Sequence, residues 1–220
     1  QHYLDRFVAG EIEERDLLRG TEYFQRWRYD YRLYRPILDF ARERGIPVVA
    51  LNVPGEVTSK VAREGLDSLD AEQQQWVPAE IERGNAAYEE RLRRVFEQHP
   101  SVDEGGFERF LDAQLLWDEG MAERAAEYLQ EHPDQRMVIL AGAGHLEYGD
   151  GIPDRLQRRL GDRQAVVING LRGELEPDLA DYLLLPEPRE LPPAGLLGVM
   201  LESGGEGPRV QGFRPDSPAR

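Results

Sequence analysis

The sequence has no cysteine and a single lysine, Lys60, among its 220 residues. Without cysteine there are no disulfides, thiolate metal ligands or cysteine nucleophiles, although this leaves the cellular compartment open. Long apolar runs are also absent, and no stretch is apolar enough for a transmembrane helix. The 42 acidic residues outnumber the 27 basic ones, which gives a net charge of −15. Such an acidic chain is a poor partner for nucleic acid or an anionic membrane surface.

Residues 137–153, MVILAGAGHLEYGDGIP, combine an apolar run with glycines, a histidine and a tyrosine. The apolar run over 137–141 predicts a strand that is covered on both faces, and Pro153 is typical of a helix start. His145 and Tyr148 are therefore expected in a strand-to-helix loop, where open α/β sheets bind ligands.

A dinucleotide fingerprint does not fit this loop. The motif G-x-G-x-x-G would require a glycine at position 147, which is Glu147. His145 remains open to two interpretations, a metal or acid–base residue and a structural histidine with satisfied hydrogen bonds.

The whole chain alternates helical patterns with short apolar runs. This alternation predicts an α/β fold with a mainly parallel sheet flanked by many helices. Because four strands are few for this length, we expect one or more N-terminal strands to be missing. The expected helices span residues 2–9, 13–20, 36–44, 56–64, 70–76, 79–98, 106–130 and 153–160. The expected strands span residues 46–52, 137–141, 165–168 and 181–185.

The character of the chain changes after Leu185. Four prolines within residues 186–193 predict a stiff linker, which we place at 187–194 after a domain over 1–186. Residues 195–220, GLLGVMLESGGEGPRVQGFRPDSPAR, resemble the start of an all-β PDZ domain, truncated to about a third. In that family the loop at 195–198 offers N–H groups to a peptide carboxylate, but this fragment is expected to lack a working groove. The alternative is a flexible tail with accidental similarity.

Three segments of the larger part resemble the ChaN-like haem-binding lipoproteins, which are related to the Tiki and erythromycin-esterase-like proteins. They are YDYRLYRPILDFARERGIPVVALNVP at 29–54, AQLLWDEGMA at 113–122 and AGAGHLEYGDGIP at 141–153. The resemblance covers roughly residues 1–186. The family's first strand, with a Gly-Glu-x-His type motif, and a second strand with a glutamate are missing here. The resemblance implies a bacterial cell-envelope protein, either periplasmic or a membrane-anchored lipoprotein.

The resemblance also implies haem, shared across a homodimer of two such domains. Ferric iron would be held by a tyrosinate, a hard anionic donor suited to it. Tyr148 is the first choice of iron ligand, against the alternative of a tyrosine that packs its ring under the loop. Tyr31 and Tyr34, which lie among arginines, are the reserve candidates.

Basic side chains and histidine would bind the haem propionates. His145 is the first candidate, followed by Lys60 and by Arg28, which belongs to an arginine-rich run over residues 26–35. The alternative for most of these arginines is a solvated surface. We further expect Asp118 to orient His145, and Asn52 to line the same rim of the sheet.

Two other functions stay open. Related families hydrolyse esters or peptides with glutamate and histidine pairs, and His145 would then be the catalytic residue. No serine stands in a nucleophile elbow, and the family's N-terminal partners are missing. An envelope adaptor that binds C-terminal peptides through a complete PDZ domain is the third function.

Overall fold

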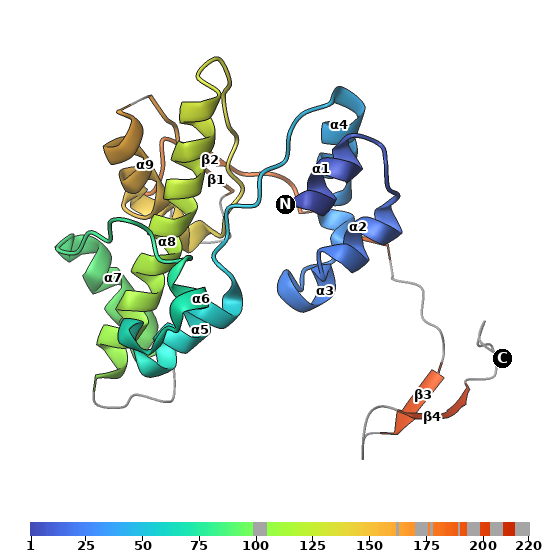
Figure 1. Cartoon of the computed structure of the whole chain (residues 1–220), viewed down its shortest axis with the longest axis horizontal. Coiled ribbons are helices and arrows are strands. Elements are labelled where there is room, and N and C mark those ends of the chain that lie inside the picture. The colour runs from blue at the N-terminus through green and yellow to red at the C-terminus, as the bar shows by residue number, and fades with distance from the viewer. Residues whose placement is uncertain are drawn as a thin grey trace. The chain divides into compact units, whose positions relative to one another are not determined.

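The structure is a computed structural model that describes residues 1–98, 105–161, 163–169, 176, 178–188, 190–192, 199–202 and 209–213. Contacts divide the chain into two units, Gln1–Pro186 and Glu187–Arg220. The first unit is α/β, and its described part is mostly helical (Figure 1). In the described ranges, no helix combines the length and the apolar character needed to cross a bilayer.

Three of the first four helices, α1, α2 and α4, contribute to a small apolar core. Phe7, Ile12 and Leu17 are buried in this core, and Leu4 and Leu38 pack against it. The last helix of the group carries a proline in its first turn and ends at a left-handed glycine, as its sequence predicts. The helices are α1 (His2–Val8), α2 (Glu14–Gly20), α3 (Tyr23–Arg26) and α4 (Arg35–Arg44).

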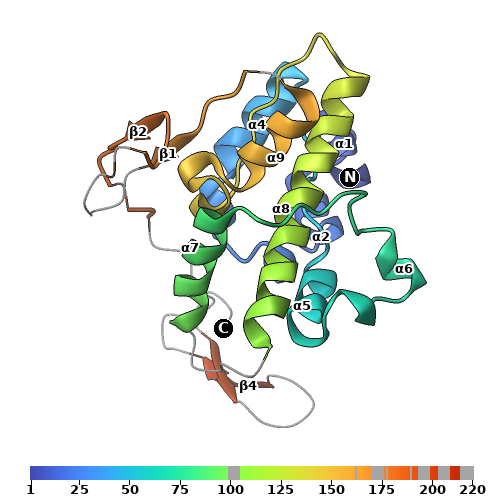
Figure 2. The same ribbon diagram turned by 90° about the vertical axis from the view of Figure 1, so that its left-hand side faces the viewer.

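A long central helix, α8, organises the remaining helices. Helices α5, α7 and α9 all pack against it (Figures 1 and 2). Its alanines and leucines enter three separate apolar clusters, so that most of its faces are buried. These helices are α5 (Gly55–Glu64), α6 (Ala71–Gln74), α7 (Ala86–Glu97), α8 (Gly106–Glu131) and α9 (Ile152–Leu160). Four short 3₁₀ turns lie between the described helices: η1 (Tyr31–Leu33) precedes α4, η2 (Leu66–Ser68) follows α5, and η3 (Ala143–His145) and η4 (Glu147–Gly149) precede α9.

The mainly parallel sheet expected from the sequence is not present among the described residues. In the first unit they contain one parallel pair, β1 (Val167–Asn169) with β2 (Tyr182–Leu184). The segments 46–52 and 137–141 have no assigned helix or strand and lie outside both described sheets. In the first segment, side chains bind backbone groups that a neighbouring strand would otherwise bind.

Gln1 and Arg124 provide these side-chain contacts. The Gln1 side chain donates to the Val48 carbonyl and accepts from the Ala50 N–H, both at 2.9 Å. The Arg124 guanidinium donates to the Leu51 carbonyl at 3.1 Å. The expectation of buried strands at 46–52 and 137–141 was therefore wrong, whereas the short strands near 165–168 and 181–185 are confirmed.

Helix α7 begins later than the expected residue 79. Asn85 caps it by accepting a hydrogen bond from the Tyr88 N–H at 3.1 Å. The residues before the cap donate their backbone N–H groups to carboxylates of α8 instead, Ala79 to Glu123 at 2.9 Å and Glu82 to Glu119 at 3.1 Å. Tertiary contacts with α8 thus replace the first helical turns.

The second unit contains an antiparallel pair, β3 (Val199–Glu202) with β4 (Arg209–Phe213). The pairing is irregular between Met200 and Leu201. The carboxylate-binding loop predicted at 195–198 lies outside the described residues, so the resemblance to a PDZ domain stays a prediction.

Candidate functional site

The loop before α9 is built from two 3₁₀ turns that hold the two leading candidates. His145 ends η3 and Tyr148 is the middle residue of η4. The His145 N–H donates to the Gly142 carbonyl at 3.0 Å, which closes the first turn. Ile139 and Ala141, just before the loop, pack against the apolar cluster of α8 and α9. The expected loop before a helix is confirmed, whereas the strand expected to lead into it is not present.

Tyr148 adopts the left-handed backbone conformation, with φ 59° and ψ 5°. A residue with a bulky side chain rarely adopts it, at a cost on the order of 1 kcal/mol. Its N–H donates to the Leu179 carbonyl at 2.8 Å, and its hydroxyl donates to Glu176 Oε2 at 2.5 Å. Contacts at both ends of the residue thus hold it in this conformation.

A guanidinium group lies against the Tyr148 ring. Arg91 of α7 has its Cζ 4.9 Å from the ring centroid and forms a two-pronged ion pair with Asp150. The pKa of Tyr148 is raised, first by its hydrogen bond to Glu176, whereas the charge of Arg91 acts in the opposite direction. The phenol is therefore protonated at neutral pH, and its proton already faces an acceptor.

His145 is held by a buried carboxylate. Its Nδ1 lies 2.5 Å from Oδ1 of Asp118, whose side chain is 1% exposed. The second oxygen, Oδ2, accepts a hydrogen bond from the Tyr88 hydroxyl at 2.6 Å. Burial and the neighbouring Asp118 raise the pKa of Tyr88, so this phenol remains a donor. The contact that the sequence predicts between Asp118 and His145 is present.

Trp117 and Asn52 extend this cluster. The Trp117 ring meets the His145 ring edge-on, with centroids 5.0 Å apart. Its indole Nε1 donates to Asn52 Oδ1 at 3.0 Å. Asn52 thus reaches the same group of side chains through Trp117, although the sheet rim on which it was expected is not present.

Gly151 allows the chain to pass close to this cluster. A Cβ atom at this position would lie 2.2 Å from the His145 carbonyl oxygen and 3.2 Å from Oδ2 of Asp118. The Arg155 side chain, which is buried, donates to the Gly151 carbonyl at 2.9 Å. The absence of a side chain at Gly151 therefore contributes directly to the position of His145.

Tyr31 and Tyr34 lie in the arginine-rich N-terminal part. Tyr31 is 5% exposed, and its hydroxyl has no partner among the described residues. Burial raises the pKa of Tyr31 to about 12, which disfavours its phenolate near neutral pH. The ring of Tyr34 packs against that of Trp27, with centroids 5.7 Å apart.

Arg28 and Lys60 make local contacts. Arg28 Nε donates to the Gln25 carbonyl at 3.3 Å, and Lys60 Nζ donates to Gln73 Oε1 at 2.9 Å. Among the contacts described for the chain, none joins Arg28, Lys60, Tyr31 or Tyr34 to the loop of His145 and Tyr148. The structure therefore brings together two of the sequence candidates and leaves four elsewhere.

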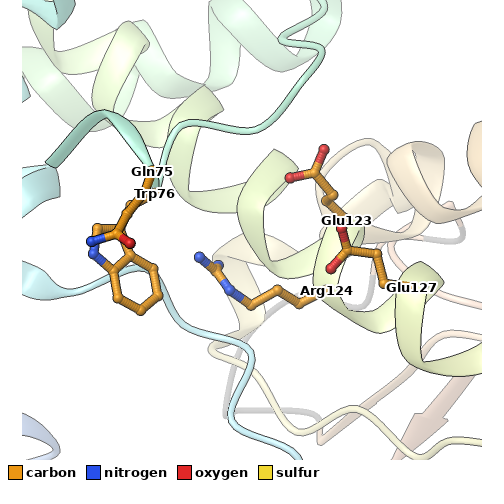
Figure 3. A pocket seen from close by; sticks show the side chains of 5 residues that line it. All are labelled: Gln75, Trp76, Glu123, Arg124 and Glu127. Atoms are coloured by element: carbon orange, nitrogen blue, oxygen red, sulfur yellow. The ribbon is translucent and has the colours of Figure 1, made fainter. Parts of the chain in front are cut away.

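An open pocket of about 230 Å³ lies at a different place, on the α6 side of α8 (Figure 3). Arg124 projects towards Trp76, with its Cζ 4.8 Å from the ring. Burial lowers the pKa of Arg124. The volume is below the range of roughly 300–1,000 Å³ that is usual for ligand sites. Its lining contains no residue of the His145 loop: Gln75, Trp76, Glu123, Arg124 and Glu127.

Sequence reasoning missed Tyr88, Arg91 and Glu176 as parts of the site. Tyr88 and Arg91 lie three apart on one helix and thus share a face, which is the only signal that the sequence offers for them. Glu176 is 28 positions beyond Tyr148, and no local pattern predicts its contact. Within the described part of the chain, no group of three or more histidine and acidic side chains has the arrangement of a metal site.

Comparison with known proteins identifies the family. Protein RETICULATA-RELATED 5, chloroplastic, of Arabidopsis thaliana is 24% identical over 204 residues, which cover 82% of this chain. The match covers 26% of that relative, so this chain spans about a quarter of its length. No solved structure matches. Residues 1–156 match the family model described as "Haem-binding uptake, Tiki superfamily, ChaN", and the chain belongs to this family.

Proposed function

We propose that this protein binds haem, with the ferric iron held by the phenolate of Tyr148. Membership of a haem-binding family supports the ligand. The observation that carries the choice of residue is the environment of Tyr148, which is 37% exposed and has an arginine on its ring and a carboxylate on its hydroxyl. Tyr31, with its buried hydroxyl and a pKa of about 12, is the weaker candidate.

The donor chemistry of these residues fits haem. Haem would supply a ferric centre that prefers an anionic oxygen ligand. Glu176 accepts the phenolic hydrogen bond at 2.5 Å and is placed to take the proton that ligation releases. Arg91 lies against the same ring, where its charge favours the phenolate. The two contacts act in opposite directions on the pKa of Tyr148: Arg91 favours the phenolate, whereas the hydrogen bond to Glu176 raises the pKa and is given up when the oxygen binds iron.

The propionates would bind cationic and hydrogen-bonding side chains. His145 is the first candidate because its ring is 19% exposed and shares the loop with Tyr148. Arg28, an exposed guanidinium, and Lys60 would serve if a second protomer brings them to the haem, in a homodimer. Both roles are part of the proposal.

Titration of ferric haem into the purified chain tests the proposal. We expect saturable changes in the Soret and charge-transfer bands that are lost or strongly weakened in Tyr148→Phe. Tyr3→Phe is the matched control, because Tyr3 is 38% exposed, close to the 37% of Tyr148. Absence of saturable binding by the wild type would overturn the function, and unchanged spectra in Tyr148→Phe would overturn the ligand.

One observation favours a second function, hydrolysis. The carboxylate of Asp118, 2.5 Å from Nδ1 of His145, leaves Nε2 free to accept a proton from water. Ester or peptide turnover that disappears in His145→Ala would support this function. Without such turnover, the pair serves ligand binding alone.

The second unit is proposed to contribute to a PDZ domain that binds C-terminal peptides once complete. Its antiparallel pair of Val199–Glu202 with Arg209–Phe213 is compatible with two PDZ strands. A longer chain that extends this unit to a full domain should bind such peptides in the micromolar range. We also propose placement at the bacterial cell envelope, periplasmic or lipid-anchored, which fractionation of cells that express the full-length protein would test.

A further inference from the structure

Tyr88 is a buried side chain that the proposed ligand set does not use. It lies on α7, is 1% exposed, and donates its hydroxyl to Oδ2 of Asp118 at 2.6 Å. We propose that Tyr88 is a positioning residue that acts through Asp118 to keep the His145 ring in its Nδ1–H form, with Nε2 as the free acceptor. This inference rests on the proposed function, because it assigns the control of a residue in that same site.

The argument begins with the cost of burying a carboxylate. Asp118 is fully buried, and a buried carboxylate without partners is strongly unfavourable. Each of its oxygens has one donor, His145 on Oδ1 and Tyr88 on Oδ2. Removal of either donor leaves one oxygen buried without that hydrogen bond.

The two donors are not equivalent. A phenol such as Tyr88 can donate one hydrogen, and burial keeps it protonated, so Oδ2 always faces a donor. A neutral imidazole instead has one protonated and one bare nitrogen, and the hydrogen bonds around it select between them. The Tyr88 hydroxyl, by holding Oδ2, keeps Oδ1 of Asp118 turned towards Nδ1 of His145, and an oxygen held there accepts the hydrogen of that nitrogen. Nε2 is then bare.

Packing around Tyr88 fixes its hydroxyl in place. The guanidinium carbons of Arg91 and Arg155 lie 5.5 Å and 4.9 Å from its ring centroid. Leu92 and Leu111 belong to the same buried cluster. A ring enclosed in this way has little rotational freedom, so its hydroxyl is held in position for Asp118. Asp118 in turn holds the His145 ring in position.

A free Nε2 is what the site needs from His145. To bind a propionate, the His145 ring takes up a proton at Nε2 and donates it. To act as a base or as a metal ligand, the ring uses the lone pair of Nε2. A carboxylate behind the ring supports all three uses, since it stabilises the charge that the ring gains. Among the described contacts, α7 does not touch His145 directly. Tyr88 connects this helix to His145 through Asp118.

Nitrogen-15 NMR of the haem-free chain with labelled histidine tests this inference directly. The His145 signals are assigned by their loss in His145→Gln. We expect the wild type to show the Nδ1–H form, and Tyr88→Phe to shift the ring towards the Nε2–H form that free histidine prefers. Tyr23→Phe is the matched control, because the buried Tyr23 hydroxyl has no partner among the described residues and should leave the spectrum unchanged.

A second arm measures haem affinity of the same three proteins. Tyr88→Phe weakens the support of one propionate partner, so we expect haem binding weaker by up to about tenfold, and no such loss in Tyr23→Phe. An Nε2–H ring in the wild type, or the same ring form in wild type and Tyr88→Phe, would overturn the inference. If Tyr88→Phe does not fold, Tyr88→Met, which also lacks the hydroxyl, takes its place in the comparison with the wild type. If the ring forms are as expected but the wild type does not bind haem, only the proposed function is overturned.

Discussion

Asp118 Oδ1 lies 2.5 Å from Nδ1 of His145, and the two residues are 27 positions apart in the chain. Helix α8 supplies the carboxylate from its buried middle, while the loop before α9 supplies the ring. We predict that Asp118→Asn lowers the free energy of unfolding by about 2–3 kcal/mol, because an asparagine has one acceptor oxygen for the two donors Tyr88 and His145. Urea denaturation measures this value. Asp112→Asn on the same helix, which breaks a more exposed pair with Arg83, should cost about 1 kcal/mol or less. Equal losses in the two variants would contradict the role of Asp118.

Gly151 lies where the loop has no room for a side chain. Gly151→Ala should cost about 1–3 kcal/mol and displace His145, because the new methyl group would overlap the His145 carbonyl. Gly144→Ala is the control in the same loop, since a Cβ there meets nothing within 4 Å. Thermal unfolding measures both variants. Comparable stability of the two would show that the loop adjusts freely.

The acidity of Tyr148 provides a third prediction. The hydrogen bond to Glu176 is the main cause of its raised pKa, so Glu176→Gln should lower the pKa of the phenol. Arg91→Gln should raise it, since this charge acts in the opposite direction. Ultraviolet titration of each variant, with and without Tyr148→Phe, isolates the Tyr148 contribution. Shifts of the same sign in both variants would contradict the described contacts.

The helices were predictable, whereas the sheet and much of the site were not. The helical spacing of the apolar residues of α8 and the glycine that ends α4 are local signals, and the loop of His145 and Tyr148 follows from its glycines and Pro153. The apolar run at 137–141 also predicts a strand, but β-pairing depends on neighbours that no local pattern specifies. Val138 is 87% exposed there, which shows that one face of the segment is uncovered. The contact of Arg91 with Tyr148 is equally non-local.

Alkaline pH should destabilise the protein in part through Tyr31. Its pKa rises from 10.0 to about 12 on folding, so the folded state binds the proton more tightly than the unfolded state. This contribution is fully present below about pH 10 and is lost as the pH rises through about 12. We expect wild type to lose about 2–3 kcal/mol more than Tyr31→Phe across this interval, as measured by urea denaturation at each pH. Parallel losses in the two proteins would contradict the burial of this phenol.

Resonance Raman spectroscopy of the ferric haem complex tests the central claim most directly. The account predicts phenolate ring vibrations that are enhanced by excitation in the charge-transfer band and shift when the tyrosines carry ring deuterium. These bands should persist in Tyr3→Phe and vanish in Tyr148→Phe. Phenolate bands that survive in Tyr148→Phe, or a wild-type complex without them, would contradict iron ligation by Tyr148.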